Sequence, residues 1–196
     1  MESAVLMLMD LQVGICGPGG LLGSKSGLSD HTAQRNVLER AAGALQQART
    51  NGVSVIHVGV AFDEDYANRN NRGQGFGRFE SNRWMLRGSE EAAFNPQVAP
   101  VDGEIVIHKG SVDPFIGTNL MEILVRLGAA QLYLGGTATN YVVESTARHA
   151  GDTGFAVTVL EDLCASYNQE MHDFAIQNIL PMFASIGHSS EFSSGA

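Results

Sequence analysis

The sequence predicts an α/β fold in which a mostly parallel central sheet is covered by helices on both faces. Short apolar runs of strand length alternate along the chain with segments whose apolar residues recur at helical spacing. These runs are apolar at consecutive positions, which suits strands that are buried on both faces of a sheet. Alternation of this kind is typical of parallel strands joined by helices, so we expect three stacked layers.

Length and composition indicate a single globular domain. The chain has 196 residues, of which 44% are hydrophobic, and this is enough to bury a sizeable core. We find no internal repeat or linker, and predict one domain over residues 1–190 with a disordered tail at 191–196. The N-terminal segment lacks a basic region and its apolar run stops at Asp10, so we expect a strand there rather than a signal peptide or membrane span.

Charge and cysteine content exclude several classes of function. The chain has 12 Lys and Arg against 21 Asp and Glu, a formal net charge of −9. An acidic chain without a basic cluster is not expected to bind nucleic acid or an anionic membrane surface. Its two cysteines, Cys16 and Cys164, cannot build a disulfide framework. We therefore expect a protein of a reducing compartment, the cytoplasm.

The first part of the chain is expected to hold two strands and one long helix. Ser3–Met9 is a continuous apolar run, and the segment Gly14–Ser29 is predicted to be a loop because it holds six glycines. Ser29 or Asp30 can cap a helix that runs to about Thr50. Asn51 and Gly52 end that helix, and residues 53–60 are expected to form the second buried strand.

A long polar segment at 61–103 shows weak signals of regular structure. Long loops in compact domains are more often functional than accidental, so we expect this segment to contribute to a functional site. The alternatives are that it is a solvated surface loop or that it contacts another subunit. The segment is rich in arginine and aromatic residues: Arg69, Arg72, Arg78, Arg83, Arg87, Phe76, Phe79 and Trp84.

The second half of the chain continues the alternation of strands and helices. Strands are predicted at 104–108, 131–134, 155–160 and 183–186. Helices are predicted at 118–127, 140–151 and 170–180, and Gly128 and Pro181 stop the first and the last of them.

Polar residues follow three of the predicted strands. Asp10 ends the first strand, Lys109 ends the third, and the turn at 135–140 follows the fourth. Parallel strands present their carboxyl ends at one edge of the sheet, so these groups converge if the strands are neighbours. A buried carboxylate and ammonium should shift each other's pKa. The pattern allows a functional pair, a purely structural ion pair, or two residues that merely face solvent.

Four segments of the chain together resemble the isochorismatase-like (cysteine hydrolase) superfamily. They are MDLQ at 9–12, HKGSVDPFIGTNL at 108–120, GGTATNYVVESTARHA at 135–150 and VTVLEDLCAS at 157–166. The resemblance covers nearly the whole chain, with the segments in the family's order and spacing. It implies a Rossmann-like three-layer sandwich with a six-stranded sheet, a small-molecule substrate and a homo-oligomer, either a dimer or a tetramer.

The resemblance also implies a catalytic site with one departure from the family pattern. In cysteine members the site is Asp, Lys and Cys, which correspond here to Asp10, Lys109 and Val142. Valine has no nucleophile, so the thioester route cannot run through this position. Cys16, in the glycine-rich segment, is the alternative source of a thiol. Cys164 is expected to pack in the core.

Three interpretations of Val142 remain open. The first is a hydrolase without a cysteine: isochorismatases of the family also lack it, and hydrolyse a vinyl ether with the aspartate as general acid. The site would then act on a vinyl ether or on an amide-type C–N bond. The second is a catalytically inactive family member that acts as a ligand-binding protein or as an oligomeric interaction protein. The third is that a natural cysteine has been substituted by valine.

Further residues are assigned to substrate binding. The resemblance implies a non-proline cis peptide at Thr137–Ala138, next to an oxyanion site. We expect no metal and no cofactor, because no histidine lies between His57 and His108 and no phosphate loop is evident. An arginine of the long loop, Arg83 or Arg87, is the candidate for a substrate carboxylate. The full set of predicted substrate-binding residues is Gln12, Arg83, Arg87, Phe115, Thr137, Ala138 and Tyr141.

Overall fold

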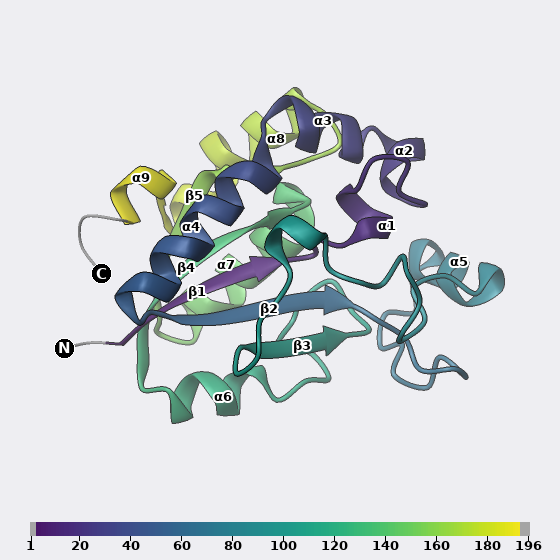
Figure 1. The fold of residues 1–196 in the computed structure, drawn as a ribbon, viewed down its shortest axis with the longest axis horizontal. Coiled ribbons are helices and arrows are strands. Elements are labelled where there is room, and N and C mark those ends of the chain that lie inside the picture. The colour runs from purple at the N-terminus through teal and green to yellow at the C-terminus, as the bar shows by residue number, and fades with distance from the viewer. Residues whose placement is uncertain (1–2, 193–196) are drawn as a thin grey trace.

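A computed structural model of the protein describes residues 3–192. Its centre is a six-stranded sheet in the order β3-β2-β1-β4-β5-β6 (Figure 1). Every pairing between neighbouring strands is parallel, which confirms the predicted α/β class. The strands are β1 Ser3–Met9, β2 Ser54–Val60, β3 Ile105–Lys109, β4 Ala129–Thr137, β5 Ala156–Ala165 and β6 Ser185–Gly187.

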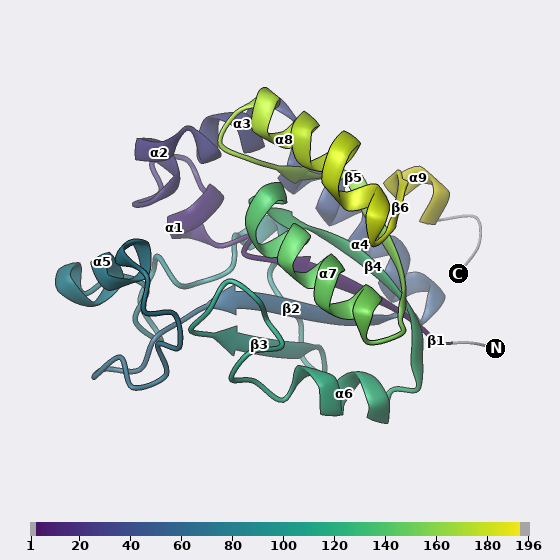
Figure 2. The same ribbon diagram turned by 180° about the vertical axis from the view of Figure 1, so that it is seen from behind.

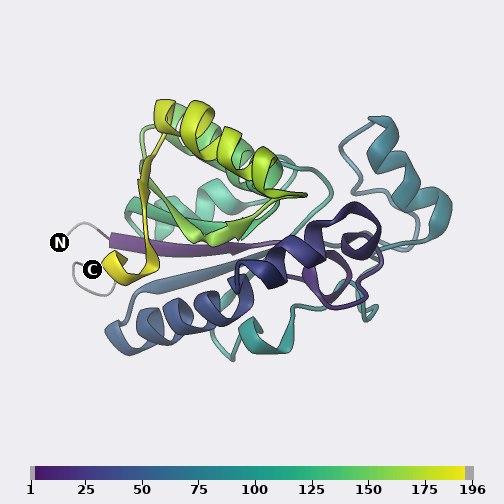
Figure 3. The same ribbon diagram turned by 90° about the horizontal axis from the view of Figure 1, so that it is seen from above.

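Helices cover both faces of the sheet. Figure 3 shows α4 on one side of the strands, and α7 and α8 on the other, while Figure 2 shows α7 and α8 side by side on their face. The helices are α1 Val13–Cys16, α2 Gly23–Ser26, α3 Leu28–Gln34, α4 Val37–Asn51, α5 Gln74–Asn82, α6 Leu120–Arg126, α7 Glu144–Asp152, α8 Gln169–Phe174 and α9 Ser189–Phe192. The short turns are η1 Pro96–Val98, η2 Thr139–Val143, η3 Ala175–Ile179 and η4 Leu180–Met182.

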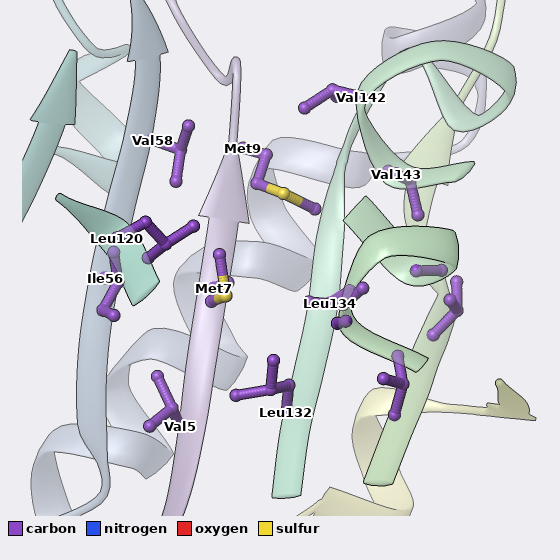
Figure 4. Packing of buried hydrophobic residues seen from close by; sticks show 14 of the residues in the cluster. Val5, Met7, Met9, Ile56, Val58, Leu120, Leu132, Leu134, Val142 and Val143 are labelled. Atoms are coloured by element: carbon purple, nitrogen blue, oxygen red, sulfur yellow. The ribbon is translucent and has the colours of Figure 1, made fainter. Parts of the chain in front are cut away.

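The strand β1 shows how the sheet divides the core in two. Its side chains alternate between the two faces because successive Cβ atoms of a strand point in opposite directions. Val5 and Met7 pack with α6 and α7, whereas Leu6 and Leu8 pack with α4. Figure 4 shows the first of these clusters, in which Val142 lies on the turn after β4.

Several predicted elements differ from those in the structure. The helix predicted from Ser29 or Asp30 to Thr50 is broken into α3 and α4, because Asn36 adopts a left-handed conformation with φ 53°. The segment predicted as a glycine-rich loop contains α1 and α2, and the long polar segment contains α5. The helix predicted at 170–180 is present, but its second half is wound as the π turn η3. Local spacing signals could not place these breaks, which depend on the surrounding chain.

Strand β5 is longer than predicted because its polar residues find partners. After Leu160 the strand continues through Glu161 and Asp162 to Ala165. Arg35 pairs with Glu161 at 2.5 Å, and the amide of Ser189 donates to Asp162 at 2.8 Å. These long-range contacts offset the desolvation of the two carboxylates, which the local sequence could not reveal.

The C-terminal end of the described chain is helical. α9 occupies the start of the predicted tail, and residues 193–196 lie outside the described residues. Within residues 3–192, no helix combines the length and the apolar character that a membrane crossing requires.

Candidate functional site

Asp10 and Lys109 meet at the carboxyl edge of the sheet. Asp10 directly follows β1 and Lys109 ends β3, so the lysine side chain reaches past β2. Its Nζ lies 3.0 Å from Oδ2 of Asp10 and donates a second hydrogen bond of 3.0 Å to the carbonyl of Ser111. The two residues are only 6% and 1% exposed. The structure thus brings Asp10 and Lys109 together, although β1 and β3 are not neighbouring strands.

The two carboxylate oxygens of Asp10 differ in their surroundings. Oδ1 is buried and has no hydrogen-bond partner among the described residues. Burial raises the pKa of Asp10, and the charge and hydrogen bond of Lys109 oppose that rise. A carboxyl with a raised pKa and one unoccupied oxygen is equipped to exchange a proton with a bound molecule.

The turn after β4 is shaped by close packing against β1. The peptide bond between Thr137 and Ala138 is cis, as the family resemblance implied. Gly136 precedes it with φ 154°, and a Cβ at that position would lie 2.2 Å from the carbonyl oxygen of Met9. Only glycine fits there. The hydroxyl of Thr137 donates to the carbonyl of Asp10 at 3.3 Å, which ties the turn to the aspartate.

A buried polar network supports the π turn η2 from behind. The hydroxyl of Thr139 lies 2.8 Å from Nδ1 of His172, and Nε2 of His172 lies 3.2 Å from Oε1 of Glu161. Thr139 and His172 are fully buried. The sequence around Thr139 does not predict this contact, because His172 belongs to the distant helix α8. Since Thr139 does not line the cavity described below, this network positions the turn and does not itself contact a ligand.

A cavity of about 440 Å³ opens onto the Asp10–Lys109 pair. This volume is in the range of pockets that hold small organic molecules. Most of its wall is apolar or aromatic, and α5 forms one side of it. The lining residues are Asp10, Ile15, Leu21, Leu22, Lys25, Ser26, Leu28, Val60, Gly75, Phe76, Arg78, Phe79, Trp84, Lys109, Val112, Thr137, Ala138, Tyr141, Val142 and Tyr167.

The structure places six of the predicted site residues in this wall. They are Asp10, Lys109, Val142, Thr137, Ala138 and Tyr141. Val142 occupies the position of the family's cysteine and is 1% exposed. Tyr141 is 49% exposed, and its ring makes an edge contact with Tyr167 at 5.5 Å.

The other four predicted residues lie outside the cavity wall, each held by another partner. Gln12 is fully buried and bridges the backbone of Val60 and Ala92, so it is structural. Arg83 pairs with Glu64, and Arg87 pairs with Asp63 at 2.6 Å. Phe115 stacks on His149 with ring centres 4.2 Å apart. The two arginines are therefore engaged by acids of their own loop and do not face the cavity.

Neither cysteine supplies the missing nucleophile. Both thiols are buried, and neither lines the cavity. Cys16 donates to the carbonyl of Gln12 at 3.3 Å and Cys164 to that of Leu160 at 3.4 Å. Burial raises the pKa of each thiol to about 12, so both are protonated at neutral pH.

Several residues that line the cavity were not assigned to a site from the sequence, among them four that carry a charge or an aromatic ring. Lys25 comes from α2, Arg78 from α5, Trp84 from the following loop and Tyr167 from the segment after β5. The sequence shows that the long polar segment is rich in arginine and aromatic residues, but which of them line the cavity depends on the placement of α5. In residues 3–192, no group of three or more His, Cys, Asp or Glu side chains is arranged to hold a metal ion.

Comparison with known proteins identifies the family. The sequence model of the family described as Isochorismatase domain matches residues 3–191. The chain is 30% identical over 193 residues to the isochorismatase family protein YecD of Escherichia coli O157:H7, covering 94% of this chain and 92% of that protein. It is 26% identical over 205 residues to the ureidoacrylate amidohydrolase RutB of Caulobacter segnis, covering 97% and 84%.

A solved structure shares the fold. The crystal structure of an isochorismatase family protein from Desulfovibrio vulgaris matches with a TM-score of 0.85 at 21% identity, covering 97% of this chain and 96% of that one. The match of sequence and fold extends over the whole six-stranded sheet and the edge that carries Asp10 and Lys109. The chain therefore belongs to the isochorismatase family of hydrolases.

Proposed function

We propose that the protein hydrolyses a small organic molecule by acid–base chemistry of Asp10 and Lys109, without a cysteine nucleophile. One observation carries the proposal: a buried carboxyl at the base of a cavity, with Oδ2 held by Lys109 and Oδ1 without a partner among the described residues. A group in this state can give or take a proton when a substrate displaces water from the cavity.

The first candidate reaction is hydrolysis of a vinyl ether. Protonated Asp10 gives its proton to the enol carbon, which leaves an oxocarbenium ion. Water adds to that cation and returns a proton to the Asp10 carboxylate, and the hemiketal then separates into a carbonyl compound and an alcohol. This route needs a carboxyl that keeps its proton, and the raised pKa of Asp10 favours it.

The second candidate reaction is hydrolysis of an amide-type C–N bond. Here the Asp10 carboxylate takes a proton from water, the water oxygen attacks the carbonyl carbon, and the proton passes to the leaving nitrogen. The relative from Caulobacter segnis carries the name of an amidohydrolase, which supports a C–N substrate. The two routes require opposite protonation states of the same residue.

The remaining residues of the wall have supporting roles in either route. Lys109 holds Oδ2 of Asp10 and orients the carboxyl. Backbone N–H groups near Ala138 and Val142 are the proposed contacts for a substrate oxygen, in the manner of an oxyanion site. The phenol of Tyr141 stands at the exposed side of the cavity, where it can contact the substrate.

A binding protein without catalysis is the second candidate function. The observation that favours it is the cavity wall itself, which holds no cysteine or histidine among the described residues. In this case the cavity retains a ligand, and the Asp10–Lys109 pair serves its recognition or the stability of the sheet edge.

Substrate screening with Asp10→Asn separates these functions. The protein is tested against panels of vinyl ethers and small amides, and the asparagine variant keeps the shape of Asp10 but cannot transfer a proton. We expect its turnover to fall by roughly 10²–10⁴-fold, the usual contribution of a general acid or base. Arg126→Gln, on the remote helix α6, is the control.

The pH profile then distinguishes the two routes. For a vinyl ether, kcat/KM falls as the pH rises through the pKa of Asp10; for an amide, it rises over the same interval. Full activity in Asp10→Asn contradicts the acid–base role. Tight binding of compounds that are never turned over supports the binding function instead.

A further inference from the structure

We propose that the cavity takes an organic carboxylate with an apolar body, and that Lys25 and Arg78 hold its anionic group at the mouth. This inference rests on the proposed function only in using the same cavity. It assigns a chemical class to the molecule that occupies it. The two cations come from separate segments, α2 after β1 and α5 after β2, which lie at the same end of the sheet (Figure 1).

The first observation concerns which cations are left without an acid. Most Lys and Arg side chains are in ion pairs with Asp or Glu, as expected for a chain of net charge −9. The paired ones are Arg35, Arg40, Arg49, Arg69, Arg83, Arg87, Lys109 and Arg148. Among the described residues, the exceptions are Lys25, Arg72, Arg78 and Arg126. Two of these exceptions line the same cavity.

The second observation is the charge balance of the cavity wall. Lys25, Arg78 and Lys109 are its cations, and Asp10 is its sole carboxyl within the described part of the chain. Because Lys109 is bound to Asp10 at 3.0 Å, the charges of Lys25 and Arg78 remain uncompensated. A cavity with low-dielectric walls and an excess of one sign attracts a ligand of the opposite sign.

The third observation is the position of the two cations relative to the apolar wall. Lys25 and Arg78 are exposed, whereas Asp10 is buried, so the cations mark the mouth and the acid marks the base. Phe76 and Trp84 line the same cavity and supply aromatic surface that suits an apolar body. Nζ of Lys25 lies 5.9 Å from the centre of the Trp84 ring, so the cation already sits beside this wall.

This arrangement defines the shape of the ligand. Its carboxylate and the group that reaches Asp10 must be at opposite ends of the molecule, with an apolar or aromatic portion between them. We therefore expect an acid with a longer apolar portion to bind more tightly than a short one. The guanidinium of Arg78 can bind a carboxylate through two parallel hydrogen bonds, and the ammonium of Lys25 adds a second charge.

Binding can be measured without turnover by using molecules that cannot be hydrolysed. The probes are 3-phenylpropionate and 5-phenylpentanoate, each compared with the neutral alcohol of the same chain length. Trp84 is the one tryptophan of the chain and lines the cavity, so its fluorescence reports on occupancy there. Calorimetry supplies the dissociation constants. We expect 5-phenylpentanoate to bind roughly tenfold more tightly than 5-phenylpentanol, because only the acid is paired with the two cations.

Charge-removing variants then test the two cations. Lys25→Gln and Arg78→Gln should each weaken binding of 5-phenylpentanoate by about three- to tenfold, with little change for the alcohol. Arg126→Gln removes an equally unpaired charge from α6 and should leave both constants unchanged. Circular dichroism and the melting temperature show whether each variant is folded.

Three outcomes overturn the inference. They are equal affinity for acid and alcohol, no saturable binding of either, and an equal loss in Arg126→Gln and Arg78→Gln. Failure of the proposed function gives a different result, because a protein that binds the acid through Lys25 and Arg78 but turns nothing over contradicts hydrolysis alone. Conversely, turnover of a carboxylate substrate with unchanged kcat/KM in Lys25→Gln and Arg78→Gln contradicts the carboxylate site alone.

Discussion

The hydroxyl oxygen of Thr139 lies 2.8 Å from Nδ1 of His172, although the two residues are 33 positions apart. This contact joins the π turn that carries Val142 to helix α8. His172 in turn contacts Glu161 of β5 at 3.2 Å, so three elements meet in one buried chain of hydrogen bonds. The network holds the turn beside the cavity in a single arrangement.

Thr139→Val should destabilise the protein and loosen the turn. The substitution keeps the shape of the side chain but leaves a ring nitrogen of His172 buried without a partner, which costs about 1–3 kcal/mol. Urea unfolding measures the loss. Thr153→Val is the control: it removes the hydrogen bonds of an exposed hydroxyl to the carbonyls of His149 and Ala150, which water can replace, so the loss should be smaller. An unchanged urea midpoint for Thr139→Val would show that the hydrogen bond between Thr139 and His172 does not contribute to stability.

Stability should decline as the pH falls below the ordinary pKa of histidine. Burial lowers the pKa of His172, and the nearby charge of Arg35 lowers it further, while Glu161 acts in the opposite direction. The folded state therefore holds this ring neutral, whereas the unfolded chain takes up a proton below a pH of about 6.5. The contribution of neutral His172 to the unfolding free energy is fully present above that pH. It is lost as the pH decreases toward the lowered pKa of His172.

The variant His172→Gln tests this dependence. It should be less stable than the wild type at pH 8, and its unfolding free energy should vary less between pH 7 and pH 5. Each such histidine contributes a slope of at most about 1.4 kcal/mol per pH unit. Burial also lowers the pKa of His57 and His108, so part of the slope must remain. A variant with the full wild-type slope would exclude His172 as a contributor.

Lys109→Met should make stability strongly dependent on the charge of Asp10. Removing one partner of a buried ion pair leaves an uncompensated charge, at a cost of about 3–5 kcal/mol. Because Lys109 opposes the effect of burial, its loss raises the pKa of Asp10 further. The folded variant then keeps its proton more readily than the unfolded chain, so its stability decreases as the pH rises through that pKa.

Chemical unfolding at pH 5 and pH 8 measures this effect. Lys109→Met should lose more stability at pH 8 than at pH 5 relative to the wild type. The double variant with Asp10→Asn should recover most of the loss at pH 8, because no carboxylate remains to be buried alone. Equal losses at both pH values, without recovery in the double variant, would contradict this account.

Glu104 should contribute to acid stability at the other end of the sheet. Burial alone raises its pKa, but hydrogen bonds from Arg49, the amide of Val101 and His57 outweigh burial and hold the pKa at about 2. The carboxylate therefore stabilises the fold above the ordinary pKa of about 4.3 and loses this effect as the pH falls toward 2. Glu104→Gln should flatten the loss of unfolding free energy in this interval, and an unchanged acid titration of stability would disprove the role.

Val142→Cys tests whether the turn still supports thiol chemistry. Cysteine is smaller than valine, so the substitution fits the buried wall without overpacking. If the cis turn and Asp10–Lys109 retain the arrangement of the family's cysteine members, the variant should acquire hydrolysis of small amides. The assay is release of ammonia, and Val142→Ser and Val142→Ala are the controls. No gain in a folded variant with a reactive thiol would show that the surrounding groups no longer suit the thioester route.

Much of the fold could be predicted because its signals are local. The apolar run of β1 was located to its terminal residues, and alternation of strands and helices defined the class. The motif at 135–150 placed the cis bond at Thr137–Ala138 through the family resemblance. Helix breaks were harder to predict, since Asn36 interrupts α3 and α4 in a segment whose apolar spacing fits one helix.

The sequence by itself determined the α/β class, the position of Asp10 and Lys109 at the carboxyl ends of two strands, and the absence of a nucleophile at Val142. These follow from residue type, periodicity and the common direction of parallel strands. The tertiary structure alone decided that Lys25 and Arg78 face the cavity, that Arg83 and Arg87 are occupied by Glu64 and Asp63, and that His172 reaches Thr139. Such contacts depend on how α2, α5 and α8 pack across distant parts of the chain, and no local pattern encodes those distances.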